Sequence, residues 1–125
     1  MSDPRGDALA ISHEDLPAAT LVRLRGEVDL SNAGTLRDAL DAIIDQRRSI
    51  ILDCSGLTYI DSVGFHVLFR ARQDLKRYGC QLLIAAASPT LQDAFKIINI
   101  ERHIRCVPSV AEALGALNEP ENPAS

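Results

Sequence analysis

The chain has 125 residues, of which 46% are hydrophobic and 24% charged, and its formal net charge is −4. This length suffices for one domain with its own core but not for two, and the negative charge argues against direct nucleic-acid binding, which normally needs a basic patch. No apolar run approaches the roughly 20 residues that span a bilayer, so membrane insertion is not expected. The first residues, with Asp3 and Asp7, do not resemble a secretory signal.

Cysteine and histidine usage gives further limits. The three cysteines are odd in number and scattered, which is typical of thiols in a reducing compartment and predicts a cytoplasmic protein. The histidines have no metal-ligand spacing with one another or with the cysteines, so neither a metal nor another cofactor is predicted. The residues concerned are Cys54, Cys80, Cys106, His13, His66 and His103.

The first predicted elements form a hairpin followed by a helix. Residues 8–13 predict a weak short strand, and residues 20–29 alternate between apolar and charged side chains, as a half-buried antiparallel strand does. Apolar residues then recur on one face of a helix that is predicted to run from Ser31, as N-cap, to about Asp45. Residues 1–7, which precede the hairpin, are expected to be flexible.

The middle of the chain predicts a buried strand and a second helix. Residues 49–53 are nearly all apolar, as a central parallel strand is, and the polar residues 53–56 predict a turn. The helix is expected to begin with Ser62 as its N-cap and to end near Tyr78, with Gly79 as its C′ residue. Such a helix start suits an anion, because its N–H groups and the helix dipole favour negative charge.

The rest of the chain continues the alternation of strand and helix. The predicted elements are a strand at 81–87, a helix from Ser88, a strand at 103–107 and a helix from Ser109 to about Leu117. Residues 118–125 are expected to be a flexible tail. One α/β domain is therefore predicted over residues 8–117, with a small mixed sheet, mostly parallel after the opening hairpin, and about four helices packed on it.

Three short motifs resemble those of STAS domains, specifically the anti-sigma factor antagonists. They are G-E-V-D at residues 26–29, D-x-S-G at 53–56 and D-S-x-G at 61–64, and they occur in the order of that family. The resemblance extends from about residue 9 to residue 117. It implies the same fold class as the pattern of elements does: a small mixed sheet with helices packed against it.

The resemblance also implies a site. Ser62 would be the phosphoacceptor of a partner anti-sigma factor serine kinase, and Asp29 would lie close to it. Asp61 and Gly64, on either side of Ser62 in the motif, complete the surroundings of the expected phosphosite. A phosphate there would add about −1.5 to −2 charges at pH 7, so we expect a partner surface to sense the change while the fold stays intact.

The function implied by the resemblance is regulation of bacterial transcription. Unphosphorylated, the protein would bind the anti-sigma kinase and free a sigma factor; phosphorylated on Ser62, it would let go, and a phosphatase would reset it. The chain would be a kinase substrate and not an enzyme, since it contains no P-loop, no G-x-S-x-G elbow and no G-x-G-x-x-G helix start. The alternatives are a non-switching STAS interaction module in a lipid-transport or stressosome-type assembly, and a small-ligand or nucleotide-binding domain.

Several residues depart from the usual pattern of that family. Val63 stands where many members have a second serine, and His66 where many have a glycine. His66 is four residues after Ser62, on the same helix face, so it either contacts the phosphate or the partner in a pH-sensitive way or is a surface histidine. Phe65, with Phe69, either forms an apolar partner-contact patch or packs beneath a neighbouring helix.

A rival phosphosite at Asp53 is excluded by its context. A carboxylate at the end of a central parallel strand resembles the phosphoacceptor of a response-regulator receiver. A receiver also needs an acidic pair after its first strand and a lysine at a later strand end. Here the first strand ends at Ser12 and His13, and no lysine follows the strand at 81–87.

Overall fold

The computed structural model describes residues 8–117, so the segments predicted to be flexible, 1–7 and 118–125, lie outside the described residues. The elements are β1 (Ala10–Asp15), β2 (Thr20–Val28), α1 (Ala33–Ile44), β3 (Ile50–Ile60), α2 (Ser62–Lys76), β4 (Leu82–Ala85), α3 (Pro89–Ile98), the short 3₁₀ helix η1 (Ile100–Arg102), β5 (Arg105–Val107) and α4 (Val110–Ala116). Strands and helices alternate after the opening hairpin, as predicted.

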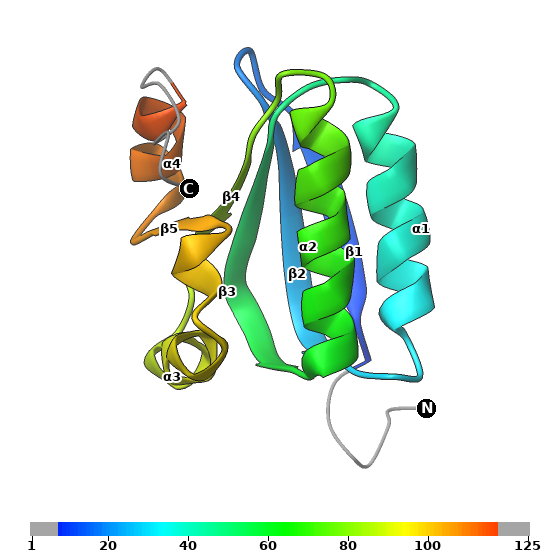
Figure 1. Cartoon of the computed structure of the whole chain (residues 1–125), viewed down its shortest axis with the longest axis vertical. Coiled ribbons are helices and arrows are strands. Elements are labelled where there is room, and N and C mark those ends of the chain that lie inside the picture. The colour runs from blue at the N-terminus through cyan, green and yellow to red at the C-terminus, as the bar shows by residue number, and fades with distance from the viewer. Residues whose placement is uncertain (1–7, 118–125) are drawn as a thin grey trace.

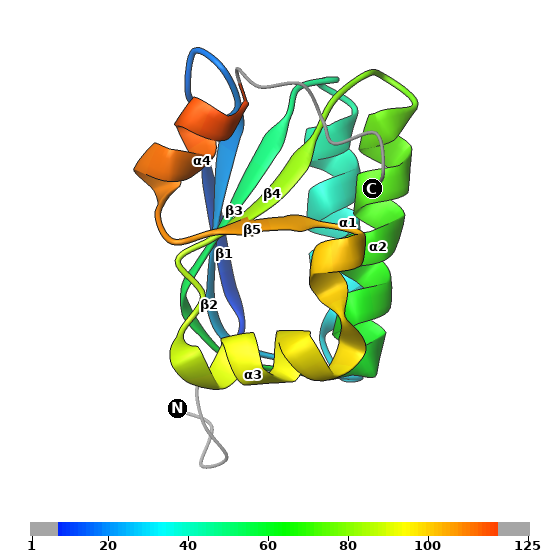
Figure 2. The ribbon, with the colours of Figure 1, turned by 60° about the vertical axis from the view of Figure 1, so that its left-hand side comes forward.

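The five strands form one mixed sheet whose spatial order, β1-β2-β3-β4-β5, is also the order of the chain (Figure 1). β1 is antiparallel to β2, and every later pair is parallel. Because parallel connections are right-handed and the strands advance in one direction, α1 and α2 lie side by side on the same face of the sheet. α3 crosses the carboxyl end of the sheet (Figure 2). The predicted fold class is confirmed.

The main core lies between the sheet and these three helices. Alternation along β2 directs Val22, Leu24 and Val28 into it and leaves Arg23 and Arg25 exposed. Its other large members include Leu36 and Leu40 of α1, Leu52 of β3, Leu68 and Leu75 of α2, and Phe95 of α3. α2 therefore buries the apolar stripe that its sequence predicts.

A smaller core covers part of the opposite face of the sheet. α4 packs there, and its Ala113 and Ala116 contact a cluster that includes Leu21, Ile51 and Leu83. Because α4 has only 7 residues, it covers one end of this face, and side chains such as Arg23 lie exposed beyond it. The outer face of the sheet is thus apolar near α4 and polar toward the carboxyl ends of the strands.

The polar turn predicted at 53–56 is wrong, because β3 continues through these residues to Ile60. Cys54 is buried in the main core and Ser55 is exposed, and the pairing with β2 shifts register between Asp53 and Gly56, so this part of β3 is an irregular, bulged stretch of strand. The carboxylate of Asp53 accepts a hydrogen bond from the Ser55 N–H at 3.0 Å. Polar residues fit a strand here because none of the helices within residues 8–117 covers this end of the outer face.

The helix and strand ends show smaller differences. The N-cap of α1 is Asn32, and no side chain caps the helix. The prediction of Ser31 as the N-cap is therefore wrong. α2 ends at Lys76, earlier than the predicted Tyr78, and Gly79 adopts the left-handed φ of 71° that the predicted helix end requires. The predicted starts of α3 and α4 are confirmed, since Ser88 and Ser109 accept hydrogen bonds from the Leu91 and Glu112 N–H groups.

Candidate functional site

The first turn of α2 lies at the carboxyl edge of the sheet, beside the end of β2 (Figure 1). Val28 and Ile60 are paired across the parallel strands β2 and β3. Asp29 and Asp61 directly follow this pair, and the Asp61 N–H donates a hydrogen bond to the Val28 carbonyl at 3.1 Å. The sheet therefore brings two residues that are far apart in sequence to neighbouring strand ends, immediately before Ser62.

Asp61, and not the predicted Ser62, is the N-cap of α2. Its backbone is extended, and one carboxylate oxygen accepts hydrogen bonds from the N–H groups of Val63 at 3.0 Å and Gly64 at 3.1 Å. Its carbonyl accepts the first helical hydrogen bond, from Phe65. Ser62 is the first helical residue and is exposed. Because the carboxylate of Asp61 caps the helix, the Ser62 hydroxyl is not needed for that purpose.

The loop that carries Asp29 is held by its own hydrogen bonds. The Asp29 carboxylate accepts from both the N–H and the hydroxyl of Ser31. The Asp29 N–H donates to the Asn32 side chain at 2.9 Å, and that side chain in turn donates to the Glu27 carbonyl at 2.9 Å. The carboxylate at the end of β2 is therefore fixed in place next to the start of α2.

Gly64 allows the start of α2 to approach the strand ends closely. A Cβ atom at this position would lie 2.5 Å from Ile60 Cγ1 and 2.8 Å from Val28 Cγ1, whereas real Cβ contacts are essentially never below 3.0 Å. The glycine of the D-S-x-G motif is therefore required by packing between the helix and the sheet. This contact sets the depth at which Ser62 sits above the sheet edge.

Phe65 packs beneath a neighbouring helix, the second of the two alternatives for this residue. Its side chain is only 5% exposed, and its ring meets that of Phe95 in α3 edge to face, with centroids 5.7 Å apart. Phe69 is partly buried against the main core, and its ring lies 5.3 Å from that of His103. In this structure Phe65 is therefore a core residue and not the partner-contact surface that was the other alternative.

One exposed residue near the site was predicted from sequence, and one was not. His66 is exposed, one helical turn from Ser62, as the helical spacing predicts. Leu30, between Asp29 and Ser31, is 77% exposed, and the sequence analysis missed it. A large apolar residue in a polar loop, outside every apolar stripe, was the available signal. Ser62, Leu30 and His66 are thus among the accessible side chains at this edge, as are Ser31 and Tyr59.

Cys54 is the buried cysteine of β3. Burial, followed by the charges of Asp53 and Cys106, raises the pKa of the Cys54 thiol to about 12, so the thiol remains protonated at neutral pH.

Within residues 8–117, no three histidine, cysteine or acidic side chains are grouped as the ligands of a metal ion would be. No helix in the same range is long and apolar enough to cross a membrane.

The capping role of Asp61 can be measured separately from its charge. Asp61→Ala is expected to destabilise the domain by about 1 kcal/mol, because it leaves two N–H groups of the first turn without their acceptor. Asp61→Asn keeps an acceptor oxygen, and asparagine caps as well as aspartate, so this variant should lose no more than a few tenths of a kcal/mol of unfolding free energy. Urea denaturation measures both variants. An equal loss in the two would contradict the cap hydrogen bonds and assign the effect to the charge.

Comparisons with known proteins agree with this fold. Residues 10–113 match the STAS domain family, and the chain belongs to that family. Its fold is similar to that of an anti-sigma factor antagonist from Mycobacterium paratuberculosis, with a TM-score of 0.80 at 21% identity over 95% of this chain and 100% of that one. The phosphorylated form of the Bacillus cell fate determinant SpoIIAA is also similar, with a TM-score of 0.65 at 21% identity over 86% of this chain and 99% of that one.

A second group of relatives consists of transporters. The chain is 30% identical over 74 residues to the sulfate transporter of Mus musculus, which amounts to 59% of this chain but only 9% of the transporter. The chain thus spans a small fraction of the length of this curated relative. Membership of the STAS family is therefore compatible with two settings, a small separate protein and one domain of a much longer chain.

Proposed function

We propose that this protein is an anti-sigma factor antagonist that is switched by phosphorylation of Ser62. The observation that carries the proposal is the position of Ser62: exposed, in the first turn of α2, with helix capping supplied by the carboxylate of Asp61. A kinase can therefore use the hydroxyl without dismantling the cap. The similarity of the fold to the phosphorylated form of SpoIIAA supports the same reading.

In this proposal the unphosphorylated protein binds an anti-sigma factor serine kinase over the start of α2 and releases the sigma factor that the kinase holds. Leu30, in the loop after β2, and His66, one helical turn after Ser62, are exposed, and they are the contacts we assign to the kinase. The γ-phosphoryl group of ATP is transferred to the Ser62 Oγ, and a phosphatase later hydrolyses the ester. The cycle takes place in the bacterial cytoplasm.

The switch is electrostatic. A phosphate adds about −1.5 to −2 charges at pH 7, which the N–H groups and dipole of α2 partly stabilise. The carboxylates of Asp61 and Asp29 repel it, and both are held by hydrogen bonds to their own loops. The new charge therefore remains on the surface, where a docked partner meets both repulsion and added bulk. Little change of fold is required.

The second candidate function is a non-switching STAS interaction module within a larger transport or stressosome-type assembly. The observation in its favour is the 30% identity to a sulfate transporter over 74 residues. In that case the exposed edge at Ser62 would be a permanent contact surface, and phosphorylation would play no part.

The test is intact-mass analysis after incubation with candidate anti-sigma kinases and Mg-ATP. We expect wild type to gain one phosphate and Ser62→Ala to gain none. Ser55→Ala is the matched control, because Ser55 is also exposed but lies in β3, and it should be phosphorylated like wild type. A stable complex without phosphate on either protein would favour the second candidate. Neither phosphate nor complex with any candidate kinase would contradict antagonism of these kinases.

A further inference from the structure

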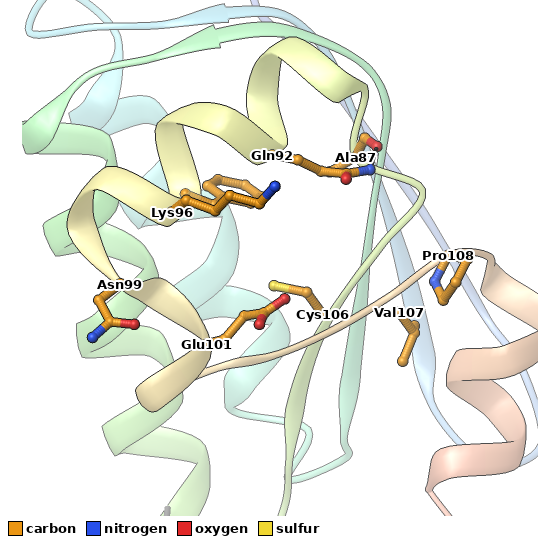
Figure 3. A pocket seen from close by; sticks show the side chains of 9 residues that line it. Ala87, Gln92, Lys96, Asn99, Glu101, Cys106, Val107 and Pro108 are labelled. Carbon is orange, nitrogen blue, oxygen red and sulfur yellow. Dashed lines mark hydrogen bonds between the residues drawn. The ribbon is translucent and has the colours of Figure 1, made fainter.

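A pocket of about 230 Å³ lies outside the Ser62 site, between α3, η1 and the end of β5 (Figure 3). Its wall includes Ala87, which comes shortly after the end of β4, and Val107 and Pro108, which are the last residue of β5 and the one after it. β4 and β5 are parallel. The pocket therefore lies beyond the carboxyl ends of β4 and β5.

Most of the lining is apolar. Phe95 contributes its ring from α3, and Val107 and Pro108 form the facing wall. The Cys106 side chain is also directed into the space (Figure 3). Burial, followed by the charge of Glu101, raises the pKa of the Cys106 thiol to about 12, so the thiol remains protonated and contributes a nearly apolar surface. This part of the pocket suits a hydrocarbon group.

Two opposite charges face the same space. Lys96 extends into the pocket from α3, and Glu101 extends into it from η1 on the other side (Figure 3). In the part of the chain that the structure describes, neither side chain forms an ion pair. Both are accessible to solvent. A ligand that enters the pocket therefore meets an ammonium group on one side and a carboxylate on the other.

The backbone around the pocket is held in an unusual conformation. Ala86, immediately before the lining residue Ala87, has a left-handed φ of 63°, and Asn99 at the end of α3 has a φ of 58°. The Ala86 N–H donates to the Val107 carbonyl at 3.1 Å, and the Gln92 side chain donates to the Ala87 carbonyl at 2.8 Å. An alanine keeps this conformation only where its surroundings enforce it, and such positions gather at binding sites.

We propose that this pocket binds a small zwitterion, an α-amino acid with a branched apolar side chain, with the ligand carboxylate at Lys96 and its ammonium group at Glu101. The hydrocarbon side chain lies against Phe95, Val107 and Pro108. The volume is below the roughly 300–1,000 Å³ of pockets for drug-sized ligands, which favours a molecule of amino-acid size. A ligand with both charges can pair with both facing groups, whereas a ligand with one charge can form only one of the two ion pairs.

The test is NMR titration of the ¹⁵N-labelled protein with L-leucine and with two analogues that each lack one charge, 4-methylpentanoate and 3-methylbutylamine. We expect saturable amide shifts confined to residues 86–108 with leucine, and binding of each analogue about fivefold to tenfold weaker. Lys96→Met and Glu101→Gln should weaken leucine binding to the same extent. Arg102→Gln is the matched control, because Arg102 is exposed beside Glu101 but does not line the pocket.

Three outcomes would overturn the proposal. One is the absence of saturable shifts with leucine in the folded wild-type protein. Another is equal or tighter binding of 4-methylpentanoate, which would make the pocket a site for simple carboxylates. The third is unchanged leucine binding in both Lys96→Met and Glu101→Gln. None of these measurements involves Ser62 or a kinase, so their outcome is independent of the proposed phosphorylation switch.

Discussion

Phe65→Ala is expected to destabilise the domain by about 3–5 kcal/mol, the range for removing a large aromatic side chain from a core. The ring is 5% exposed and meets Phe95 edge to face, so the variant loses its apolar burial and a favourable aromatic pair. Because Phe65 lies in the first turn of α2 and Phe95 in α3, the cavity would also loosen the contact between these helices. Urea denaturation with an unchanged m-value would measure the loss.

His66→Ala provides the comparison at the next residue. His66 is exposed, and a surface substitution of this kind usually changes stability by no more than about 0.5 kcal/mol. A small effect of Phe65→Ala, similar to that of His66→Ala, would contradict the packing beneath α3 and return Phe65 to the partner-contact surface. In the proposed function, the two variants therefore separate support of the site from contact with the kinase.

Gly64→Ala is expected to destabilise the domain by about 2–3 kcal/mol, although alanine is the better helix former. The new Cβ would lie 2.5 Å from Ile60 Cγ1 and 2.8 Å from Val28 Cγ1, and overpacking of this kind typically costs about 1–3 kcal/mol. The obstructing atoms lie close to the backbone of the strand ends, so a simple rotation of a long side chain cannot relieve the contact. Thermal or urea denaturation would show the loss.

Gly34 in α1 is the matched control for Gly64. A Cβ at Gly34 would meet nothing within 4 Å, so Gly34→Ala should stabilise the domain by up to about 1 kcal/mol through helix propensity alone. The two substitutions are chemically identical, and both lie in helices that pack on the same face of the sheet. Stabilisation by Gly64→Ala would show that α2 moves away from the strand ends without cost.

The fold could be predicted from sequence where one local signal decides the structure. Alternation along residues 20–29 gave β2, and Ser88 with Pro89 gave the start of α3. The turn predicted at 53–56 was wrong because a run of polar residues can also form the solvent-facing side of a strand. Which of the two forms depends on whether another element covers that side of the sheet. Among the described elements, the short helix α4 packs at the other end of the outer face and so leaves the Ser55 side of the strand in solvent.

The site was predictable in its parts but not in its geometry. Asp61 and Ser62 are adjacent and are both good N-caps, and the choice between them follows from the strand: Asp61 directly follows the paired residue Ile60 and remains extended. The burial of Phe65 depends on Phe95, which belongs to a helix much later in the chain. No pattern within α2 alone indicates that contact. The sequence therefore could not decide between the two alternatives for Phe65.

The identity of strand order and chain order has a consequence for synthesis of the protein. Each strand from β2 onward pairs with the strand made just before it, so the emerging chain can extend the sheet without waiting for a distant segment. Once α2 has been made, the Asp61 cap and the contact of Asp29 with Ser31 have their partners. Phe65 has its partner only when α3 follows. Until then, a nascent chain would expose the aromatic ring of Phe65 beside the already formed start of α2.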